Sequence, residues 1–243
     1  MIFNTNGIVL RTIKYGETSI IVSVFTEIFG VQSYLVNGVR TQKKTVKAHY
    51  YQAASLLEMQ VYHNELKNLQ RIKEVKWSLI YNTILSDVAK NSVALYMVEL
   101  LYKCLKQPEP NPDLFSFCED AFIELDKAPD NIMANFPLYF ALQLSQFFGF
   151  QLQNNFSESN NLFDIREGKF TNEIMVGQDH VNNELSFYLS ELSRVIHPAE
   201  LNDIKMNRSS RLALLKELEN FYSWNIPDFG KMKTLDILQE VLQ

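Results

Sequence analysis

Residues 7–40 read GIVLRTIKYGETSIIVSVFTEIFGVQSYLVNGVR, and this stretch decides the fold that the sequence predicts. It holds three runs of β-branched and aromatic residues, the composition typical of strands. The runs are Ile8–Leu10, Ser19–Phe25 and Ser33–Val36. Glycines that favour turns punctuate them, at Gly16, Gly30 and Gly38. The stretch therefore predicts a β-meander of three strands.

Two further strand-like runs follow within the first 80 or so residues, Ala54–Tyr62 and Leu69–Trp77. Five strands in so short a segment predict a small Greek-key barrel of the OB type. From Ile80 onward the apolar period changes from two to about 3.6, which indicates helices. We therefore expect an α+β protein with two domains: a five-stranded OB-type β-barrel in residues 1–80 and an all-α helical domain in residues 81–243.

One segment of the second domain breaks the helical pattern. Residues 151–183 are rich in Asn, Ser and Gly and carry only short apolar patches. We expect an irregular insertion here, with a small hairpin around Glu167–Lys169. The stretch Ile132–Phe148 before it is apolar on nearly every side and is expected to be the buried axis of the helical domain.

Short motifs in the first domain add a second kind of information. G-I-V-L-R, Y-G-E-T-S, V-F-T-E-I-F-G and V-N-G-V-R follow one another in this order. On these motifs residues 1 to about 80 resemble the RecO family of bacterial recombination mediators. The resemblance is looser beyond, where it rests on Phe147–Phe150 and Lys231–Leu235.

The resemblance implies an OB-fold domain followed by a helical domain, and a protein of DNA repair that binds single- and double-stranded DNA. It also implies strand annealing and, together with RecR, the loading of the recombinase RecA onto strands coated with single-strand-binding protein. Members of such a family work in the bacterial cytoplasm, at the nucleoid during repair.

Charge is distributed unevenly along the chain. The whole sequence has a formal net charge of −5. Residues 1–80 nevertheless contain ten Lys and Arg against five Glu, whereas the remainder contains 13 basic against 23 acidic residues. A basic domain inside an acidic protein is the expected electrostatic signature of phosphate binding.

The run Arg40–Lys47 concentrates this charge, with four cations and no acid in eight residues. Single-strand binding combines cations for phosphates with flat rings for bases, and tyrosines lie nearby in the sequence. The candidate DNA-binding residues are Arg11, Lys14, Tyr15, Tyr34, Arg40, Lys43, Lys44, Lys47 and Arg71. The alternatives are that the run is a solvated charged loop and that the tyrosines belong to the core.

The resemblance also implies a docking site in the helical domain for the acidic, hydrophobic C-terminal tail of single-strand-binding protein. Such a tail needs an apolar pocket rimmed by cations. The main basic clusters of this half are Arg208, Arg211, Lys231 and Lys233, and each precedes or begins an amphipathic segment. The alternative is that these four side chains are solvated.

Catalytic and metal-binding signatures are missing from the sequence. It has no phosphate loop, dinucleotide fingerprint or nucleophile elbow, so we expect no enzyme and no cofactor. Many RecO relatives carry four zinc-binding cysteines in the insertion, whereas this chain has only Cys104 and Cys118, both outside it. We therefore expect no metal, and we expect both thiols to be reduced.

The sequence also contains no run of about 18 apolar residues and no basic-then-apolar leader, so we expect a cytoplasmic protein without a membrane span. A second function class stays open. In it the chain is a non-enzymatic adaptor whose barrel binds a protein or another polyanion, with the helical domain as a docking surface.

Overall fold

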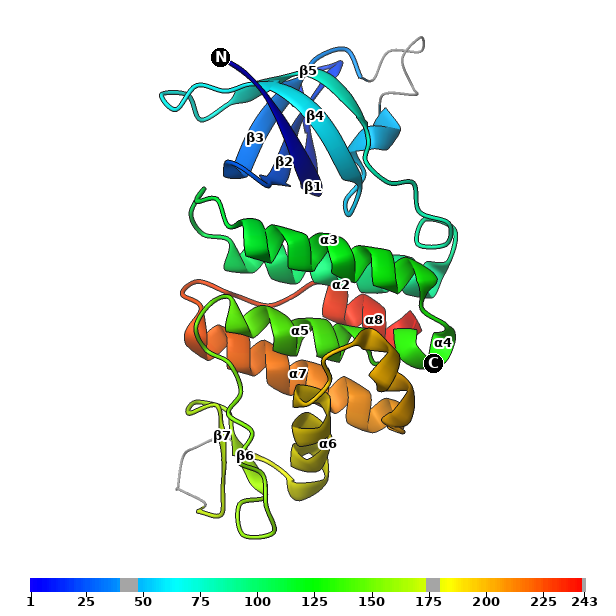
Figure 1. Cartoon of the computed structure of the whole chain (residues 1–243), viewed down its shortest axis with the longest axis vertical. Coiled ribbons are helices and arrows are strands. Elements are labelled where there is room, and N and C mark those ends of the chain that lie inside the picture. Colours follow the sequence, from blue (N-terminus) through cyan, green and yellow to red (C-terminus); the bar gives the residue numbers. More distant parts are fainter. Residues whose placement is uncertain (40–47, 174–179, 242–243) are drawn as a thin grey trace. The chain divides into compact units, whose positions relative to one another are not determined.

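The computed structural model of the chain describes residues 1–39, 48–173 and 180–241. The chain forms two compact units. The barrel unit comprises Met1–Asn82 and Leu105–Ile123, and the helical unit comprises Thr83–Cys104 and the residues from Glu124 onward. The first contains the long strands and the second contains most of the helices (Figure 1).

The barrel consists of five strands in the order β1-β2-β3-β5-β4, closed by pairing of β1 with β4. The strands are β1 (Ile2–Tyr15), β2 (Ser19–Thr26), β3 (Gly30–Val36), β4 (Leu56–Tyr62) and β5 (Gln70–Trp77), and a short 3-10 helix, η1 (His49–Tyr51), precedes β4. All pairs are antiparallel except β3 with β5, which is parallel. The predicted meander and the five-stranded OB-type barrel are confirmed.

Strand β1 is longer than the apolar run that predicted it, because it pairs on both sides. Residues 2–8 pair with β4, and residues 7–15 pair with β2. Its register with β2 shifts between Val9 and Arg11, so Leu10 is an extra residue. Such a bulge bends a strand and increases its twist, and here it lets one strand serve both sides of a closed barrel.

A second bulge explains why the faces of β5 are hard to assign from its sequence. Gln60 pairs with Glu74 but Val61 pairs with Ile72, which leaves Lys73 without an opposite residue. The alternation therefore changes phase inside the strand. As a result Ile72, Val75 and Trp77 all pack against the barrel core despite their uneven spacing.

The barrel core is apolar and closed to solvent. Its fully buried members include Val9, Val22, Val24, Tyr34, Leu57 and Val61. The first part of helix α3 (Pro112–Lys127) also belongs to this unit, although the change of period had assigned it to the helical domain. The reason is apolar contact: Phe115 of α3 and Phe25 of β2 are both buried, and their ring centroids are 5.6 Å apart.

One glycine of the barrel is required by a close approach of backbone. Gly30, at the start of β3, has a φ of +63°, and a Cβ there would overlap the backbone of Pro108 and Glu109. The proline-rich segment before α3 thus packs directly on the turn between β2 and β3. A larger residue at this position would displace that segment.

The helical unit is built around two helices that are buried on nearly all sides, α2 (Val88–Cys104) and α5 (Phe136–Gln146). The other elements are α4 (Asp130–Met133), α6 (Asn183–Ser193), η2 (Pro198–Asp203), α7 (Arg208–Asn225) and α8 (Thr234–Val241). The expected buried axis in Ile132–Phe148 is confirmed by α5. Within the described residues, none of the helices has the length and apolar content that a membrane span needs.

The first turn of α8 is held by a side chain of α2. The Glu99 carboxylate accepts hydrogen bonds from the backbone N–H of Lys233 at 3.0 Å and of Thr234 at 2.8 Å. It also accepts one from the Thr234 hydroxyl at 2.7 Å. A carboxylate at a helix N-terminus satisfies amides that have no partner inside the helix and interacts favourably with the helix dipole.

A small sheet of order β7-β6-β8 lies in the expected insertion. Its strands are β6 (Leu162–Asp164), β7 (Lys169–Thr171) and β8 (His180–Val181). Strands β6 and β7 form an antiparallel hairpin whose turn includes Gly168, as the sequence predicts. The insertion thus contributes a small sheet to the helical unit.

Candidate nucleic-acid interface

The outer surface of the barrel brings together side chains from four strands. Arg11, Ile13 and Tyr15 alternate along β1 and share one face because successive residues of a strand point to opposite sides. The pairing register places Ser23 and then Ser33 beside Arg11, and it places Ile21, Leu35 and then Arg71 beside Ile13. We call these eight residues, Arg11, Ile13, Tyr15, Ile21, Ser23, Ser33, Leu35 and Arg71, the cationic strand face.

This face offers both charge and apolar surface to solvent. Ile13 is 42% exposed and Tyr15 is 52% exposed, which is unusual for large apolar side chains in a barrel. Arg11 and Arg71 are exposed at either side of the apolar strip. A strip of exposed apolar and aromatic groups between cations is the arrangement with which proteins bind single-stranded nucleic acid.

The cations of the face differ from those of the neighbouring strand pair. Lys76 forms an ion pair with Glu58 at 2.9 Å, and Lys73 lies 3.8 Å from Glu74. Among the described residues, no carboxylate lies within ion-pair distance of Arg11, Lys14 or Arg71. The lysines of β5 are thus paired with carboxylates, whereas the cations of the cationic strand face are available to an anion.

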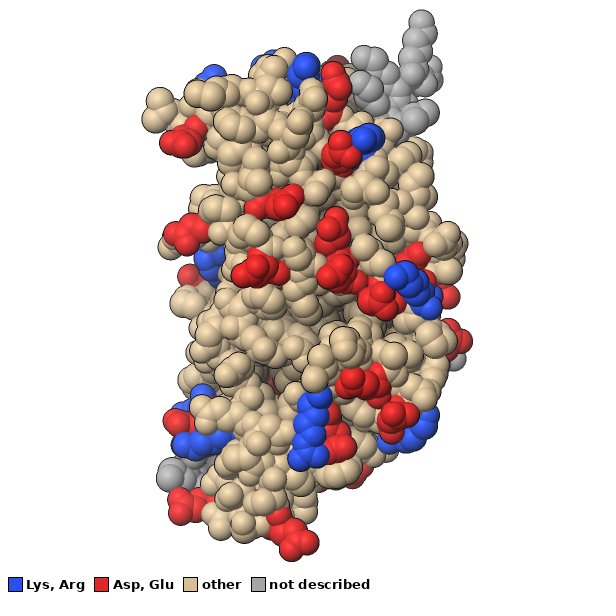
Figure 2. Space-filling view, viewed as in Figure 1, with Lys and Arg blue, Asp and Glu red and all other residues tan. Residues whose placement is uncertain are grey.

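Helix α3 carries the opposite charge. Figure 2 shows carboxylates gathered over it on the face drawn there. Its charged residues are Asp113, Glu119, Asp120, Glu124, Asp126 and Lys127. Partial burial raises the pKa of the Glu119 carboxyl, and the nearby charges of Asp120 and Glu27 raise it further. Such a surface repels phosphates.

The predicted DNA-binding residues lie in different places. Arg11, Tyr15 and Arg71 belong to the cationic strand face, and Lys14 is exposed beside it at the β1–β2 turn. Tyr34 does not reach any ligand, because its side chain is fully buried in the barrel core and burial raises the pKa of its phenol. Its position opposite Val22 makes it an inward residue. The remaining four, Arg40, Lys43, Lys44 and Lys47, lie outside the described residues.

The four cations predicted for protein binding are also separated by the structure. Arg208 donates a hydrogen bond to the Gln239 carbonyl, and Lys231 forms an ion pair with Asp236 at 3.0 Å. Lys233 is exposed and contributes its backbone N–H to Glu99. Arg211 lines a hollow of about 370 Å³, which the other three do not line.

Arg211 is a buried cation in an unusual environment. It is 8% exposed, its Nε donates to Asn135 Oδ1 at 3.0 Å, and its guanidinium also donates to the Met206 carbonyl at 3.0 Å. Burial lowers the pKa of the guanidinium, and among the described residues no carboxylate lies within ion-pair distance of it. Lys205 and Ile204 line the same hollow. A buried charge without a counter-charge favours binding of an anionic group.

Comparison with known protein families gives matches along nearly the whole chain. Residues 1–81 match the family model described as "Recombination protein O N terminal", and residues 85–235 match "Recombination protein O C terminal". The chain belongs to the RecO family. This membership confirms the predicted resemblance and assigns the chain to DNA repair and recombination.

Several RecO proteins are similar over their full length. One from Bacteroides fragilis, named "DNA repair protein RecO", is 31% identical over 242 residues, which cover 99% of each chain. Proteins of the same name from Flavobacterium johnsoniae and Phocaeicola vulgatus are 31% identical over 250 residues and 30% identical over 241 residues, again with 99% of both chains covered. As a RecO family member the chain is a non-enzymatic recombination mediator, as predicted.

The residues of the insertion do not fit the four-cysteine zinc site that the resemblance to RecO relatives implies. Both cysteines of the chain lie in α2 and α3, outside residues 151–183. No group of three His, Cys, Asp or Glu suited to a metal occurs in the part of the chain that the structure describes. Aromatic rings fill this region instead: Phe163 lies 5.3 Å from Phe170 and 5.9 Å from Phe221, measured between ring centroids.

Sequence reasoning missed part of both surfaces of this RecO protein. Ile13 lies between Arg11 and Tyr15 in the sequence, and simple strand alternation would have placed it on the same face. Ile21 and Leu35 depend on the register between strands, which the sequence alone does not show. Lys205 lies close to Arg211 in the sequence, but only the fold shows that both line one hollow together with Ala134 and Asn135.

Proposed function

We propose that this chain is a DNA-binding recombination mediator that contacts single- and double-stranded DNA through the cationic strand face of its barrel. In this role it anneals strands and, with RecR, helps to load the recombinase RecA onto strands coated with single-strand-binding protein. It does so in the bacterial cytoplasm, at the nucleoid during repair. Residues 1–80 supply its DNA-binding strands and residues 81–243 its helices, of which the first part of α3 belongs to the barrel unit.

One observation carries the DNA-binding part of the proposal. Arg11, Lys14 and Arg71 are exposed cations without a carboxylate partner among the described residues, and they flank an exposed strip that includes Ile13 and Tyr15. Phosphates bind such cations, and bases stack on or pack against such a strip. Arg40, Lys43, Lys44 and Lys47 would add further charge, on the evidence of the sequence.

A salt titration of oligonucleotide binding tests the proposal. If about five cations meet phosphates, the slope of log affinity against log salt for a single strand is near −3.5, at roughly −0.7 for each contact. Binding that does not depend on salt would exclude phosphate contacts. Equal affinity for heparin and for single-stranded DNA, with equal slopes, would favour the alternative of a polyanion-binding adaptor.

Matched variants locate the site on the barrel. Arg11→Gln combined with Arg71→Gln removes two available cations, so the slope falls in magnitude by about 1.4. Lys73→Gln combined with Lys76→Gln removes the same charge from the paired strands and leaves the slope nearly unchanged, because these cations already have carboxylate partners. Equal effects of the two double variants would show that net charge, and not the face, determines binding.

We further propose that the hollow around Arg211 receives the acidic, hydrophobic C-terminal tail of single-strand-binding protein. The buried guanidinium has no carboxylate partner among the described residues, Lys205 adds a second cation, and Ile204, Met206 and Ala134 supply apolar surface. This proposal keeps Arg211 and adds Lys205, whereas Arg208, Lys231 and Lys233 do not line this hollow.

Titration of a tail peptide tests this second proposal. Lys205→Glu is expected to weaken peptide binding at least tenfold, since it reverses a charge at the rim, and it spares the hydrogen bonds of Arg211. Lys231→Glu is the matched control, because Lys231 is paired with Asp236 and does not line the hollow. Equal affinity of both variants and the wild type would remove this hollow from the docking site.

A further inference from the structure

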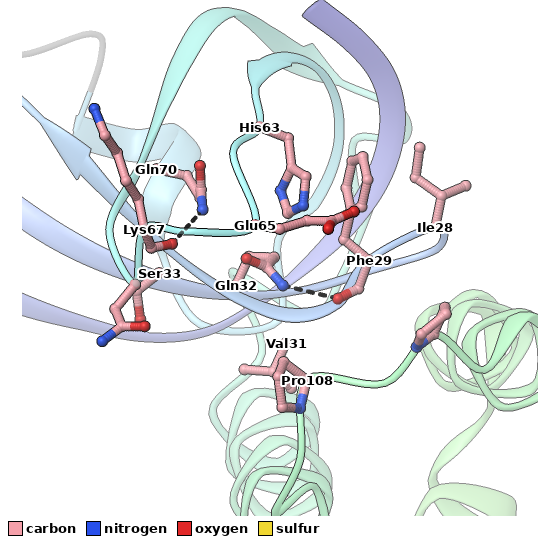
Figure 3. A pocket seen from close by; sticks show the side chains of 12 residues that line it. Ile28, Phe29, Val31, Gln32, Ser33, His63, Glu65, Lys67, Gln70 and Pro108 are labelled. Carbon is pink, nitrogen blue, oxygen red and sulfur yellow. Dashed lines mark hydrogen bonds between the residues drawn. The ribbon is translucent and has the colours of Figure 1, made fainter. Parts of the chain in front are cut away.

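A second hollow, of about 630 Å³, lies in the barrel unit next to the cationic strand face. Ser33 of β3 belongs to both, and Gln70, which lines the hollow, directly precedes Arg71 of the face. Figure 3 shows the side chains around it, which come from the start of β3, from the β4–β5 loop and from the proline-rich segment before α3. A strand bound to the face therefore reaches the hollow without leaving the surface of the barrel.

The hollow exists because β3 has a partner on one side for only part of its length. Strand β5 pairs with β3 at Tyr34 and Leu35 alone, so residues 31–33 face the loop of residues 63–69 and not a strand. A hollow of this volume is within the range of small-ligand sites, and it is large enough for one nucleotide.

The loop opposite β3 is held in place by one buried side chain. Gln70 is 3% exposed, its Oε1 accepts from the Asn64 N–H at 3.0 Å, and its Nε2 donates to the Asn64 carbonyl at 2.9 Å and to the Lys67 carbonyl. The ends of the loop are therefore fixed before any ligand arrives. A preformed site loses less conformational entropy on binding.

The walls combine ring surfaces with hydrogen-bonding groups. The rings of Phe29 and His63 are stacked, with centroids 3.9 Å apart and an angle of 13° between their planes, and Pro108 and Pro110 also line the hollow. Polar groups are supplied by Ser33, Glu65, Lys67 and Asn68. Apolar ring surfaces with a few polar groups are typical of pockets that bind an unstacked base.

The charge of Glu65 favours entry of the base of a nucleotide, and not its phosphate, into the hollow. Its carboxylate lines the hollow, and among the described residues no cation lies within ion-pair distance of it. A carboxylate repels phosphate, but it accepts hydrogen bonds from the amino groups of cytosine, adenine and guanine. Thymine has no amino group. The cations Lys67 and Arg71 at the edge are suited to the phosphates that flank the base.

We propose that this hollow holds one unstacked base of a single strand whose phosphates lie on the cationic strand face, and that Glu65 favours bases with an amino group over thymine. The proposal rests on the proposed DNA binding by that face. The hollow would give the protein a preference among bases, whereas the cationic strand face contacts phosphates and stacks on any base.

The test compares oligo-dC and oligo-dT of about 12 nucleotides, a length within the range that one OB fold covers. Their affinities are measured for the full chain, for Glu65→Ala and for Glu17→Ala. Glu17 is an exposed acid in the β1–β2 turn, outside the hollow, so its variant removes the same charge from the barrel unit. Both are exposed turn residues, so neither substitution is expected to unfold the protein.

The expected result is that Glu65→Ala lowers the ratio of dC affinity to dT affinity by about tenfold, the size of one good base contact. Glu17→Ala raises both affinities by a similar factor and leaves the ratio unchanged. If Glu65→Ala also leaves the ratio unchanged, the hollow takes no base, whether it is empty or serves a protein segment, and this inference is overturned while salt-dependent binding survives. Loss of salt-dependent binding to both oligonucleotides in the wild type would instead overturn the proposed function.

Discussion

The barrel and the small sheet of the helical unit are both built from strands, but they are held together differently. The barrel closes on itself, so every strand has neighbours, and a continuous apolar core fills its interior. The small sheet has strands of two or three residues and an order of β7-β6-β8 that leaves two edges. Its stability therefore has to come from side chains outside the ladder.

Aromatic rings and amides provide that stability. Phe163 packs on Phe170 and on Phe221 of α7, and Asn155 both donates to the Phe170 carbonyl and accepts from its N–H. Ser186 of α6 accepts from the Phe163 N–H at 2.9 Å. Rings and side-chain hydrogen bonds thus hold the small sheet to α6 and α7.

The largest expected effect comes from breaking that packing. Phe163→Ala removes a ring that is 1% exposed, and the cavity should cost about 3–5 kcal/mol of the free energy of unfolding of the helical unit. Denaturant unfolding of the full chain measures it. Phe187→Ala, at a ring that is 47% exposed, is the control and should cost much less. Equal losses would mean that the rings do not form the core of the sheet.

A smaller effect is expected in the barrel, where the β4–β5 loop depends on one side chain. Gln70→Ala removes the hydrogen bonds to the Asn64 and Lys67 backbone and leaves buried polar groups unpaired, at a cost of about 1–3 kcal/mol. Gln60→Ala is the control, since its amide accepts only an exposed bond from Lys73. Hydrogen exchange of the loop amides should increase in the first variant only.

The next effect is a pH dependence in the barrel unit, at Glu119. The pKa of Glu119 is raised in the folded protein by burial, and then by Asp120 and Glu27, so the folded state binds this proton more tightly than the unfolded chain. Its contribution to stability is therefore lost as pH rises through the raised pKa. Glu119→Gln should raise the melting temperature at pH 7 and leave it unchanged near pH 4. An equal rise at both pH values would contradict the electrostatic cause.

The smallest expected effect is none at all. Incubation with a zinc chelator should not change the melting temperature of the full chain, because residues 151–183 contain no cysteine and the described residues include no group of three His, Cys, Asp or Glu suited to a metal. Elemental analysis of the purified protein provides the second measurement. A content of one zinc per chain would contradict this prediction and would show that other side chains bind a metal.

The difference between the long barrel strands and the short strands of the small sheet also explains which features the sequence could predict. The barrel strands are long enough for alternation and glycine turns to reveal them, and the face of Arg11 and Tyr15 follows from spacing. Tyr34 was misplaced on the surface because Ser33–Val36 is a short run without alternation, so only pairing with Val22 shows that it points inward. The faces of β5 were hidden by the bulge at Lys73, which no local pattern announces.

The helical unit was less predictable in its surfaces than in its helices. The periodicity of α7 locates the helix but not the partners of Arg211, which are Asn135, the N-cap residue of α5, and Met206, in the segment before α7. The strands of the small sheet are too short to show a period of two. The bond of Arg211 to Asn135 and the packing of Phe163 on Phe221 join residues far apart in the sequence.

The hydrogen bonds between Glu99 of α2 and the first turn of α8 affect how the chain can fold during translation. Residues more than 130 positions apart complete one packed layer, in which Leu235 and Leu238 are buried. While the chain is being translated, α2 therefore leaves the ribosome long before the segment that caps its apolar side. The barrel strands, by contrast, are all available by residue 77. We expect nascent chains to fold the strands early and to need protection of α2 until α8 has emerged.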